Sequence, residues 1–333
     1  MKISVIVPTF NRNDILAQTV EALSNQDLDK GQYEIVIVDD CSTLESRSVL
    51  EKYLSSNSNI IYVRHQVNKG LAASRNTGIN TSTGDIVLFL DSDIVPEKSF
   101  VKMHLQSHLS FKDEYVAVVS NLCYDERYIR NSNFARFMND RYLGNRSVRD
   151  RGLLDLNNLP PQYFGGGISS VRKDRIVSLG MFDTNFVKYG GEDEDMGYRL
   201  NQSGVRILYC DNARAVHHDT VTLPRFKAKG REWKRNAFPI ISAKQKGYFE
   251  KTNLKYLMPI KFKRDGIGLI MKKIMLKCIL SLPVVFVLEK WAIYTDKIPY
   301  FYFPSIYRAL MAGWFLTTDS ASDSTDMGPG VWK

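Results

Sequence analysis

The chain has 333 residues, of which 44% are hydrophobic and 24% charged, and its formal net charge is +9. This is the composition of an ordinary globular protein, long enough for one large domain or for one domain with an appendage. The four cysteines are scattered without a C-x-x-C pair, which argues against a zinc site or a disulfide framework and favours a reducing compartment.

Strands and helices alternate along the first ninety residues. The N-terminal segment MKISVIVPTF lacks the long apolar core of a secretion signal, so we interpret it as the first strand. Strands that alternate with helices of about ten residues predict βαβ units, and therefore an α/β fold with a mostly parallel sheet. We expect strands over residues 3–7, 33–40, 60–64 and 86–90, and helices over residues 14–24, 44–54 and 71–80.

Polar side chains follow three of these strands. In an open α/β sheet, ligands bind at the carboxyl ends of the strands, so these side chains are candidates for a site. The sequence has neither a G-x-G-x-x-G after the first strand nor a P-loop, which argues against those two kinds of nucleotide site. The strand-end residues are Thr9, Asn11 and Arg12, then Asp39 and Asp40, then Asp91 and Asp93.

The stretch GDIVLFLDSDIVP, residues 84–96, places Asp91 and Asp93 after a buried strand. Residues two apart on a strand point the same way, so both carboxylates could face one site. One interpretation is a solvated turn in which Asp93 caps a helix that begins near Pro96. The other is a divalent metal ion on hard oxygen ligands, with the metal also binding a phosphate.

The middle of the chain is less regular. Residues 125–160 have weak periodicity, and we expect a connecting stretch that packs over the site. YFGGGISSVRK, residues 163–173, predicts a strand opened by Gly165, Gly166 and Gly167. These glycines either let the backbone approach a ligand closely or form a plain hinge.

The stretch KYGGEDEDMGYRL, residues 188–200, has four acids between a double glycine and a helical pattern. The helix macrodipole favours acids at this position. Four acids exceed what capping needs, and because crowded carboxylates raise one another's pKa, the group also suits a general base. A short expected strand then leads to His217 and His218, two of the chain's five histidines, whose position favours a ligand role.

Seven ordered blocks together resemble the family-2 glycosyltransferases with the GT-A fold. The blocks cover roughly residues 1–220 and read SVIVPTFNR, YEIVIVDDCS, NKGLAASRNTGI, GDIVLFLDSD, GGGISSVRK, GGEDEDMGYRL and AVHH. The resemblance implies an α/β, Rossmann-like GT-A fold, with a mostly parallel sheet flanked by helices. It also implies an inverting transfer of a sugar from a nucleotide-diphosphate donor, expected to be a UDP-sugar.

The resemblance assigns roles to individual residues. Asp193 matches the catalytic base, and Glu192 is expected to orient it. Mn²⁺ or Mg²⁺ is expected on Asp91, Asp93 and His217, although His218 could take the place of His217. The nucleotide pocket is expected to include Pro8, Thr9, Phe10, Arg12, Asp39, Asp40, Asn68, Arg75 and Asp91. The acceptor side is expected to include Gly165, Gly166, Gly167, Asp195 and His218.

The expected acceptor is a hydroxyl of a glycan or a lipid-linked saccharide, in the synthesis of a cell-envelope polysaccharide. The Q-x-x-R-W block of many membrane-embedded synthases is absent, and REWKRN at residues 231–236 does not match it, which favours transfer of a single sugar. Two alternatives remain open. One is a nucleotidyltransferase that makes nucleotide sugars, and the other is a non-catalytic, membrane-associated module that binds a sugar nucleotide or a glycan.

The C-terminal part is basic and aromatic. Between Arg225 and Arg308 there are 19 Lys and Arg against five Asp and Glu, which indicates an anionic partner. The longest uncharged run, residues 278–288, is too short to span a bilayer, which takes about 20 apolar residues. We expect an amphipathic attachment to an anionic membrane or an ordinary helical appendage, and no nucleic-acid binding.

These observations predict three segments. Residues 1–223 are expected to form the catalytic domain, and residues 224–316 a basic, helical region at the membrane interface. Residues 317–333 are polar and expected to be disordered. The expected location is cytoplasmic, on the inner face of the cell membrane. The oligomeric state is left open.

Overall fold

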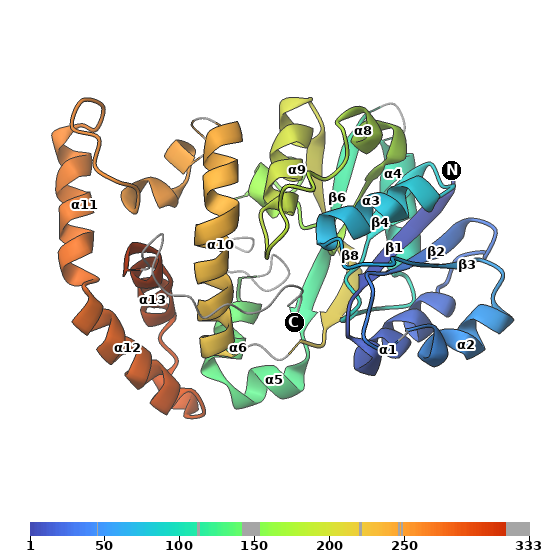
Figure 1. Cartoon of the computed structure of the whole chain (residues 1–333), viewed down its shortest axis with the longest axis horizontal. Coiled ribbons are helices and arrows are strands. Elements are labelled where there is room, and N and C mark those ends of the chain that lie inside the picture. Colours follow the sequence, from blue (N-terminus) through green and yellow to red (C-terminus); the bar gives the residue numbers. More distant parts are fainter. Residues whose placement is uncertain are drawn as a thin grey trace. The chain divides into compact units, whose positions relative to one another are not determined.

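The structure is a computed structural model that describes residues 1–44, 46–111, 114–141, 154–219, 222–245, 247 and 249–317. The described residues form two compact units (Figure 1). Unit 1 consists of the described residues within 1–125 and 140–219, and unit 2 consists of those within 126–139 and 220–317. The tail that we expected to be disordered lies outside the described residues, apart from Thr317 at the end of the last helix.

Unit 1 is built on one mixed sheet with the strand order β3-β2-β1-β4-β7-β6-β8-β5. Strands β1 to β4 run parallel, β7 is antiparallel to β4 and β6, β8 is parallel to β6, and β5 is antiparallel to β8. The strands are β1 (Ile3–Thr9), β2 (Tyr33–Asp39), β3 (Ile60–Arg64), β4 (Ile86–Phe89), β5 (Ile94–Pro96), β6 (Val116–Tyr124), β7 (Ser169–Arg172) and β8 (Arg206–His217).

Helices cover both faces of this sheet. Alternate residues of one strand enter different cores, because Val5 and Val7 of β1 pack on one side and Ile6 packs on the other. Burial on both faces explains the continuous apolar runs of the central strands. One face carries α1 (Asn13–Ser24), α2 (Arg47–Ser56) and α4 (Phe100–Ser110), and the other carries α3 (Leu71–Thr81), α8 (Lys173–Ser178) and α9 (Glu192–Gln202).

The expected α/β architecture is confirmed, and the first three expected helices correspond to α1, α2 and α3. The region after Asp93 differs from one of our two interpretations. Asp93 does not cap a helix near Pro96, because residues 94–96 form strand β5 and the next helix begins only at Phe100. The sequence analysis also missed β6, and the strand expected before His217 is long, with 12 residues.

Unit 2 is helical and has its own apolar core. Its centre is formed by aromatic residues, including Phe134, Phe137, Tyr307 and Trp314. Residues 126–139, which we expected to be part of a connecting stretch in the first domain, belong to this unit. Its helices are α5 (Glu126–Asn131), α6 (Asn133–Asn139), α10 (Leu223–Lys244), α11 (Ile267–Ile279), α12 (Leu282–Thr295) and α13 (Pro304–Thr317), with short 3-10 turns η3 (Phe249–Lys251), η4 (Asn253–Tyr256) and η5 (Pro299–Phe301).

Within unit 2, Figure 1 shows α13 between α10 and α12. α11 and α12 follow one another directly, because Ser281 has an extended backbone and Pro283 stands in the first turn of α12. In the part of the chain that the structure describes, no helix is both long enough and apolar enough to cross a membrane.

Candidate functional site

The candidate site lies at the carboxyl ends of the parallel strands. The register pairs Thr9 at the end of β1 with Asp39 at the end of β2, and β4 runs parallel beside β1. The loops that follow these strands carry Arg12, Asp40 and Asp93. The expected gathering of polar side chains at this edge is therefore present in the structure.

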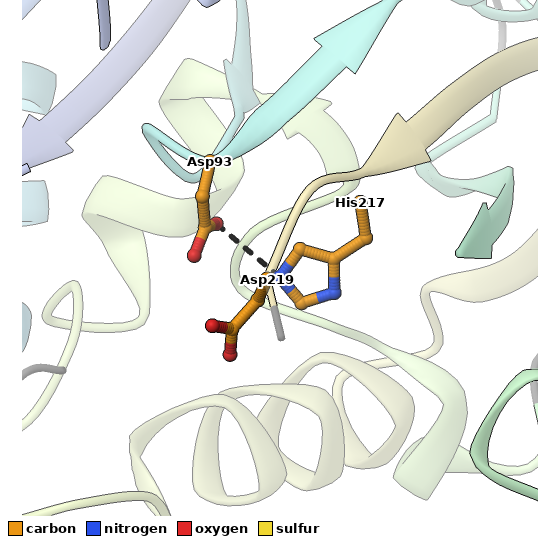
Figure 2. Close-up of side chains that lie close together, drawn as sticks. All are labelled: Asp93, His217 and Asp219. Atoms are coloured by element: carbon orange, nitrogen blue, oxygen red, sulfur yellow. Dashed lines mark ion pairs between the residues drawn. The ribbon is translucent and has the colours of Figure 1, made fainter. Parts of the chain in front are cut away.

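Three side chains form a group with the chemistry of a metal site (Figure 2). Asp93, His217 and Asp219 each offer one ligand atom, and these atoms lie within 4.8 Å of one another. Nε2 of His217 is 3.3 Å from Oδ1 of Asp93. Two carboxylates and an imidazole make a donor set that suits a divalent cation, so the residues fit a metal ion of the expected kind.

Strand pairing brings this group together. β5 runs antiparallel to β8, and its register pairs Ile94 with His217. This pairing places the turn that carries Asp93 beside the end of β8, where the backbone N–H of His218 donates to the carbonyl of Asp93 at 2.9 Å. The ring of Tyr124 stacks on that of His217, with centroids 5.1 Å apart. A short strand that the sequence analysis missed therefore positions the group.

The electrostatics of the group suit a bound cation. Burial alone would lower the pKa of His217, but the negative charges of Asp93, Asp219 and Asp91 raise it. Arg12 supplies positive charge to the same carboxylates, with Nη2 3.2 Å from Asp93 and Nη1 3.8 Å from Asp219. Arg12, which we expected in the nucleotide pocket, thus lies against the candidate metal ligands.

Asp219 was missed by the sequence analysis. It is buried and follows β8 two residues after His217. The spacing of two residues between His217 and Asp219 could have identified it, since residues two apart on an extended segment lie on one side of that segment. His218, the intervening residue, is directed elsewhere, and its Nδ1 lies 3.4 Å from Asp125. The structure therefore brings His217, not His218, to Asp93.

Asp91 has a different partner from Asp93. β4 ends at Phe89, so Asp91 and Asp93 lie in the turn that follows the strand and not on the strand itself. Asp91 instead accepts a hydrogen bond from Nη2 of Arg75 at 3.1 Å. Asp91 is absent from the group of three described above, and Asp219 is present in its place.

Arg75 connects the two acidic motifs. It extends from α3, is only 2% exposed, and its guanidinium lies over the ring of Phe182 at 5.3 Å. Its Nη2 contacts Asp91, while its Nη1 donates to Oε1 of Glu192 at 2.7 Å. One buried cation thus joins the turn after β4 to the first turn of α9.

The triple glycine makes room for this pair. A Cβ atom on Gly166 would lie 2.6 Å from Nη1 of Arg75, and a Cβ atom on Gly167 would lie 2.2 Å from Oδ2 of Asp91. The carbonyl of Gly167 also accepts from the backbone N–H of Asp91 at 3.1 Å. The close approach that we expected at these glycines is therefore an approach to the protein's own side chains. Gly165, the first of the three, lies against Ile168.

The four acids 192–195 occupy the first turn of α9, which begins after Gly190 and Gly191 in left-handed conformations. Glu192 is buried against Arg75, and burial together with the negative charge of Asp193 raises its pKa, while Arg75 opposes the rise. Asp195 is buried as well and pairs with Arg199 at 2.8 Å. Asp193 is only half-buried and accepts the N–H of Glu194 at 2.9 Å. Asp193 is thus more accessible to a substrate than Glu192 or Asp195.

The acids after β2 organise the surrounding loops. Burial alone would raise the pKa of Asp39, but hydrogen bonds from Ser42, Tyr62 and Ser46 lower it. Both oxygens of Asp40 accept backbone hydrogen bonds, from Lys69 at 2.8 Å and Gly70 at 2.9 Å.

Asp40 also holds the loop that leads to α3. His65 contacts its Oδ1 at 2.7 Å, and the exposed Asn68 donates to its carbonyl at 3.3 Å. On β1, Pro8 and Thr9 are buried, Phe10 is half-buried, and the buried hydroxyl of Thr9 makes no hydrogen bond within the described part of the chain.

Comparison with known proteins agrees with this architecture. The model of "Glycosyl transferase family 2" matches residues 4–160, and that of the "N-terminal domain of galactosyltransferase" matches residues 154–221. A chondroitin synthase of Pasteurella multocida is 30% identical over 243 residues, which cover 65% of this chain and 25% of the synthase. The chain spans between 25% and 65% of the length of the first curated relatives that it matches.

Two solved structures share the fold. A mannosyltransferase from Pyrobaculum calidifontis, in complex with GDP-mannose and Mn²⁺, has a TM-score of 0.59 at 18% identity, covering 94% of this chain and 85% of its own. Residues 1–349 of Staphylococcus aureus TarS, in complex with UDP, have a TM-score of 0.51 at 19% identity, covering 95% and 89%.

The mixed sheet flanked by helices is the GT-A fold, which these two glycosyltransferase structures share. The matched family model and the glycosyltransferases among the relatives support a glycosyltransferase of the family 2 type.

Proposed function

We propose that the protein is a metal-dependent, inverting glycosyltransferase that transfers a sugar from a nucleotide-diphosphate donor to a hydroxyl group. The group formed by Asp93, His217 and Asp219 at the carboxyl ends of the strands is the observation that carries the proposal. These three residues would hold Mn²⁺ or Mg²⁺. The ion would offset the charge of the diphosphate leaving group.

Asp193 is the proposed general base. Its half-buried carboxylate lies in the first turn of α9, and the bridge from Arg75 to Glu192 and Asp91 ties that turn to the strand edge. Asp193 accepts the proton of the acceptor hydroxyl as its oxygen bonds to the anomeric carbon. The bond from that carbon to the diphosphate breaks, and its electron pair leaves with the nucleoside diphosphate. A single displacement of this kind inverts the anomeric centre.

We propose a UDP-sugar as the donor and a glycan or lipid-linked saccharide as the acceptor, with one sugar added per encounter. The family resemblance supports the choice of uridine, as does the UDP in the TarS structure. The mannosyltransferase with GDP-mannose makes guanosine the first competing nucleotide. The match to the family 2 model and the glycosyltransferases among the relatives favour sugar transfer over the nucleotidyltransferase alternative.

Thermal stability tests the donor site. The melting temperature is measured with UDP, GDP, CDP and dTDP, each with Mn²⁺ and each with EDTA. A ligand that binds the native state raises its stability by mass action, by about 2.7 kcal/mol at a hundred times its Kd. We expect a shift with UDP that requires Mn²⁺. Folded protein that shifts with none of the four nucleotides would contradict the proposal.

The variant Asp193→Asn separates an enzyme from a binding module. The amide keeps the size of the side chain and the hydrogen bond to Glu194, but it is no base. We expect nucleotide stabilisation to be retained and turnover of donor and acceptor to fall by roughly a hundredfold or more. Glu194→Gln, at the neighbouring half-buried acid, is the matched control and is expected to keep turnover. Equal turnover in Asp193→Asn and the unmodified protein would exclude Asp193 as the base.

A further inference from the structure

Unit 2 has an unusually large number of apolar side chains exposed to solvent. Among the described residues, 24 large hydrophobic side chains are exposed, and 16 of them lie between Phe262 and Phe303. Exposed apolar groups concentrated in this way mark an interaction surface. They occupy α11, α12 and the segments that flank these two helices.

On α11 the exposed residues form one stripe. Ile267, Met271, Ile274, Met275 and Ile279 follow one another at intervals of one, three or four residues and are all exposed. Leu276 of the same helix and Leu280, which directly follows it, pack into the core of unit 2. The helix is thus apolar on its inner and on its outer side.

The next helix has the same character. Leu282, Val284, Phe286 and Val287 of α12 are exposed, whereas Val285 and Ala292 pack into the core of unit 2. Tyr294 and Tyr300 follow and are 83% and 93% exposed. Tyrosine is enriched where a membrane meets water, because its ring is apolar and its hydroxyl is polar.

The charges of residues 261–303 indicate an anionic partner. Residues 261–303 contain eight Lys and Arg against three Asp and Glu. The three acids are used inside unit 2: Asp265 pairs with Lys273, Glu289 pairs with Lys227, and Asp296 accepts the N–H of Phe134. Seven of the eight basic residues are exposed, all except Lys273. Exposed cations among exposed apolar residues fit an anionic lipid surface.

We propose that α11 and α12 bind an anionic lipid bilayer and lie in the plane of its interface. α11 has 13 residues and α12 has 14, so each is about 20 Å long, while the hydrocarbon core is about 30 Å thick. Neither helix can span that core. Their apolar side chains enter the boundary between head groups and acyl chains, and the lysines reach the anionic head groups. This inference does not depend on the proposed transfer, since it involves no donor or metal.

Vesicle binding tests this proposal with the full-length chain. The protein is sedimented with vesicles of POPC alone and with vesicles of equal parts POPC and POPG. We expect binding to the vesicles with POPG that weakens as NaCl rises from about 0.1 M to about 1 M, because the Debye length falls from about 10 Å to about 3 Å. Absence of binding to the anionic vesicles, or equal binding to both kinds, would overturn the proposal.

Two variants test the assignment to α11 and α12. The variant K272E/K277E reverses the charge of two exposed lysines. It should lower the partition coefficient between water and the POPG-containing vesicles by at least about 25-fold, since each lysine near an anionic surface contributes about fivefold. The matched control K52E/K98E reverses two exposed lysines of unit 1 and should bind more tightly than K272E/K277E.

Removing apolar groups is the second test. M271S/M275S/F286S/V287S should weaken binding by at least roughly tenfold, whereas L109S/V177S, at exposed positions of α4 and α8, should not. Circular dichroism checks that all variants fold. Vesicle binding unaffected by the changes on α11 and α12 would overturn the assignment. A protein that does not bind vesicles, and that forms a dimer which these changes dissociate, would show that a second copy covers the surface. That result would also overturn the proposal.

Discussion

Replacing Arg75 by methionine should destabilise unit 1 by up to about 3 kcal/mol at pH 7. Methionine keeps the length of the side chain but removes the cation from Glu192, which is buried 2.7 Å from the guanidinium. Breaking a buried ion pair by removing one partner costs about 3–5 kcal/mol. Protonation of Glu192 sets an upper limit on the loss, and the unmodified protein already bears part of that cost because the pKa of Glu192 is raised. Protonating a glutamate with an ordinary pKa of about 4.3 costs about 3.7 kcal/mol at pH 7.

The pH dependence of this loss has a definite sign. The folded protein already raises the pKa of Glu192, so the unfolded chain loses this proton first as the pH rises. A raised carboxylate pKa contributes stability that is complete below the unfolded value and decreases above it. Protonation at pH 5.5 costs only about 1.6 kcal/mol, so Arg75→Met should be less destabilising there than at pH 7.

Urea unfolding of four proteins measures this effect: the unmodified protein, Arg75→Met, Glu192→Gln and the double variant. The double variant should recover at least about 1 kcal/mol of the loss at pH 7, because position 192 no longer holds a buried charge that has lost its partner, although Asp91 still lacks Arg75. Arg172→Met breaks the ion pair with Asp174, which is more exposed than the pair of Arg75 with Glu192, and should cost no more than about 1 kcal/mol. A loss below about 0.5 kcal/mol in Arg75→Met, or strict additivity in the double variant, would show that Arg75 does not stabilise unit 1 through Glu192.

Two further predictions concern buried groups of unit 1. Gly167→Ala should disturb the contact between Arg75 and Asp91, because its Cβ would lie 2.2 Å from the carboxylate. We expect the free energy of unfolding in urea to fall by about 1–3 kcal/mol. An unchanged stability would contradict the assigned role of the glycine. Burial lowers the pKa of His104 to about 3 and that of His108 to about 4, so both should remain neutral at pH 5 in NMR spectra of the imidazole rings. Because the unfolded chain binds these protons near pH 6.5, each histidine subtracts about 1.4 kcal/mol of stability per pH unit below that value, and a ring that titrates near pH 6.5 in the folded protein would contradict the prediction.

The parts of the fold that local pattern controls were predictable. Each apolar run of β1, β2 and β4 is bounded by polar or glycine residues, and the alternation with helices identifies a parallel sheet. β5 has only three residues, and its existence depends on pairing with β8, more than 100 positions away in the sequence. Patterns of neighbouring residues do not report such pairing.

In the site, too, residue types were predictable from the local sequence, whereas the contacts between residues were not. The residue types at the strand ends pointed to a metal, a phosphate and a base, and the strand-end positions place them at one edge of the sheet. The partners of each carboxylate depend on tertiary contacts. Asp91 contacts Arg75 because α3 and the triple-glycine turn bring them together, and Asp219 approaches Asp93 because β5 pairs with β8.

The affinity for Mn²⁺ in the presence of UDP tests the central claim most directly. Free Mn²⁺ is measured by electron paramagnetic resonance while the unmodified protein, Asp219→Asn and Asp85→Asn are titrated. Asp85 is the control, since its exposed carboxylate stands at the amino end of β4, away from the strand ends that carry the site. We expect one Mn²⁺ bound per chain, with affinity weakened at least roughly tenfold in Asp219→Asn and unchanged in Asp85→Asn. Equal affinity in all three proteins, or no Mn²⁺ bound with UDP, would contradict it.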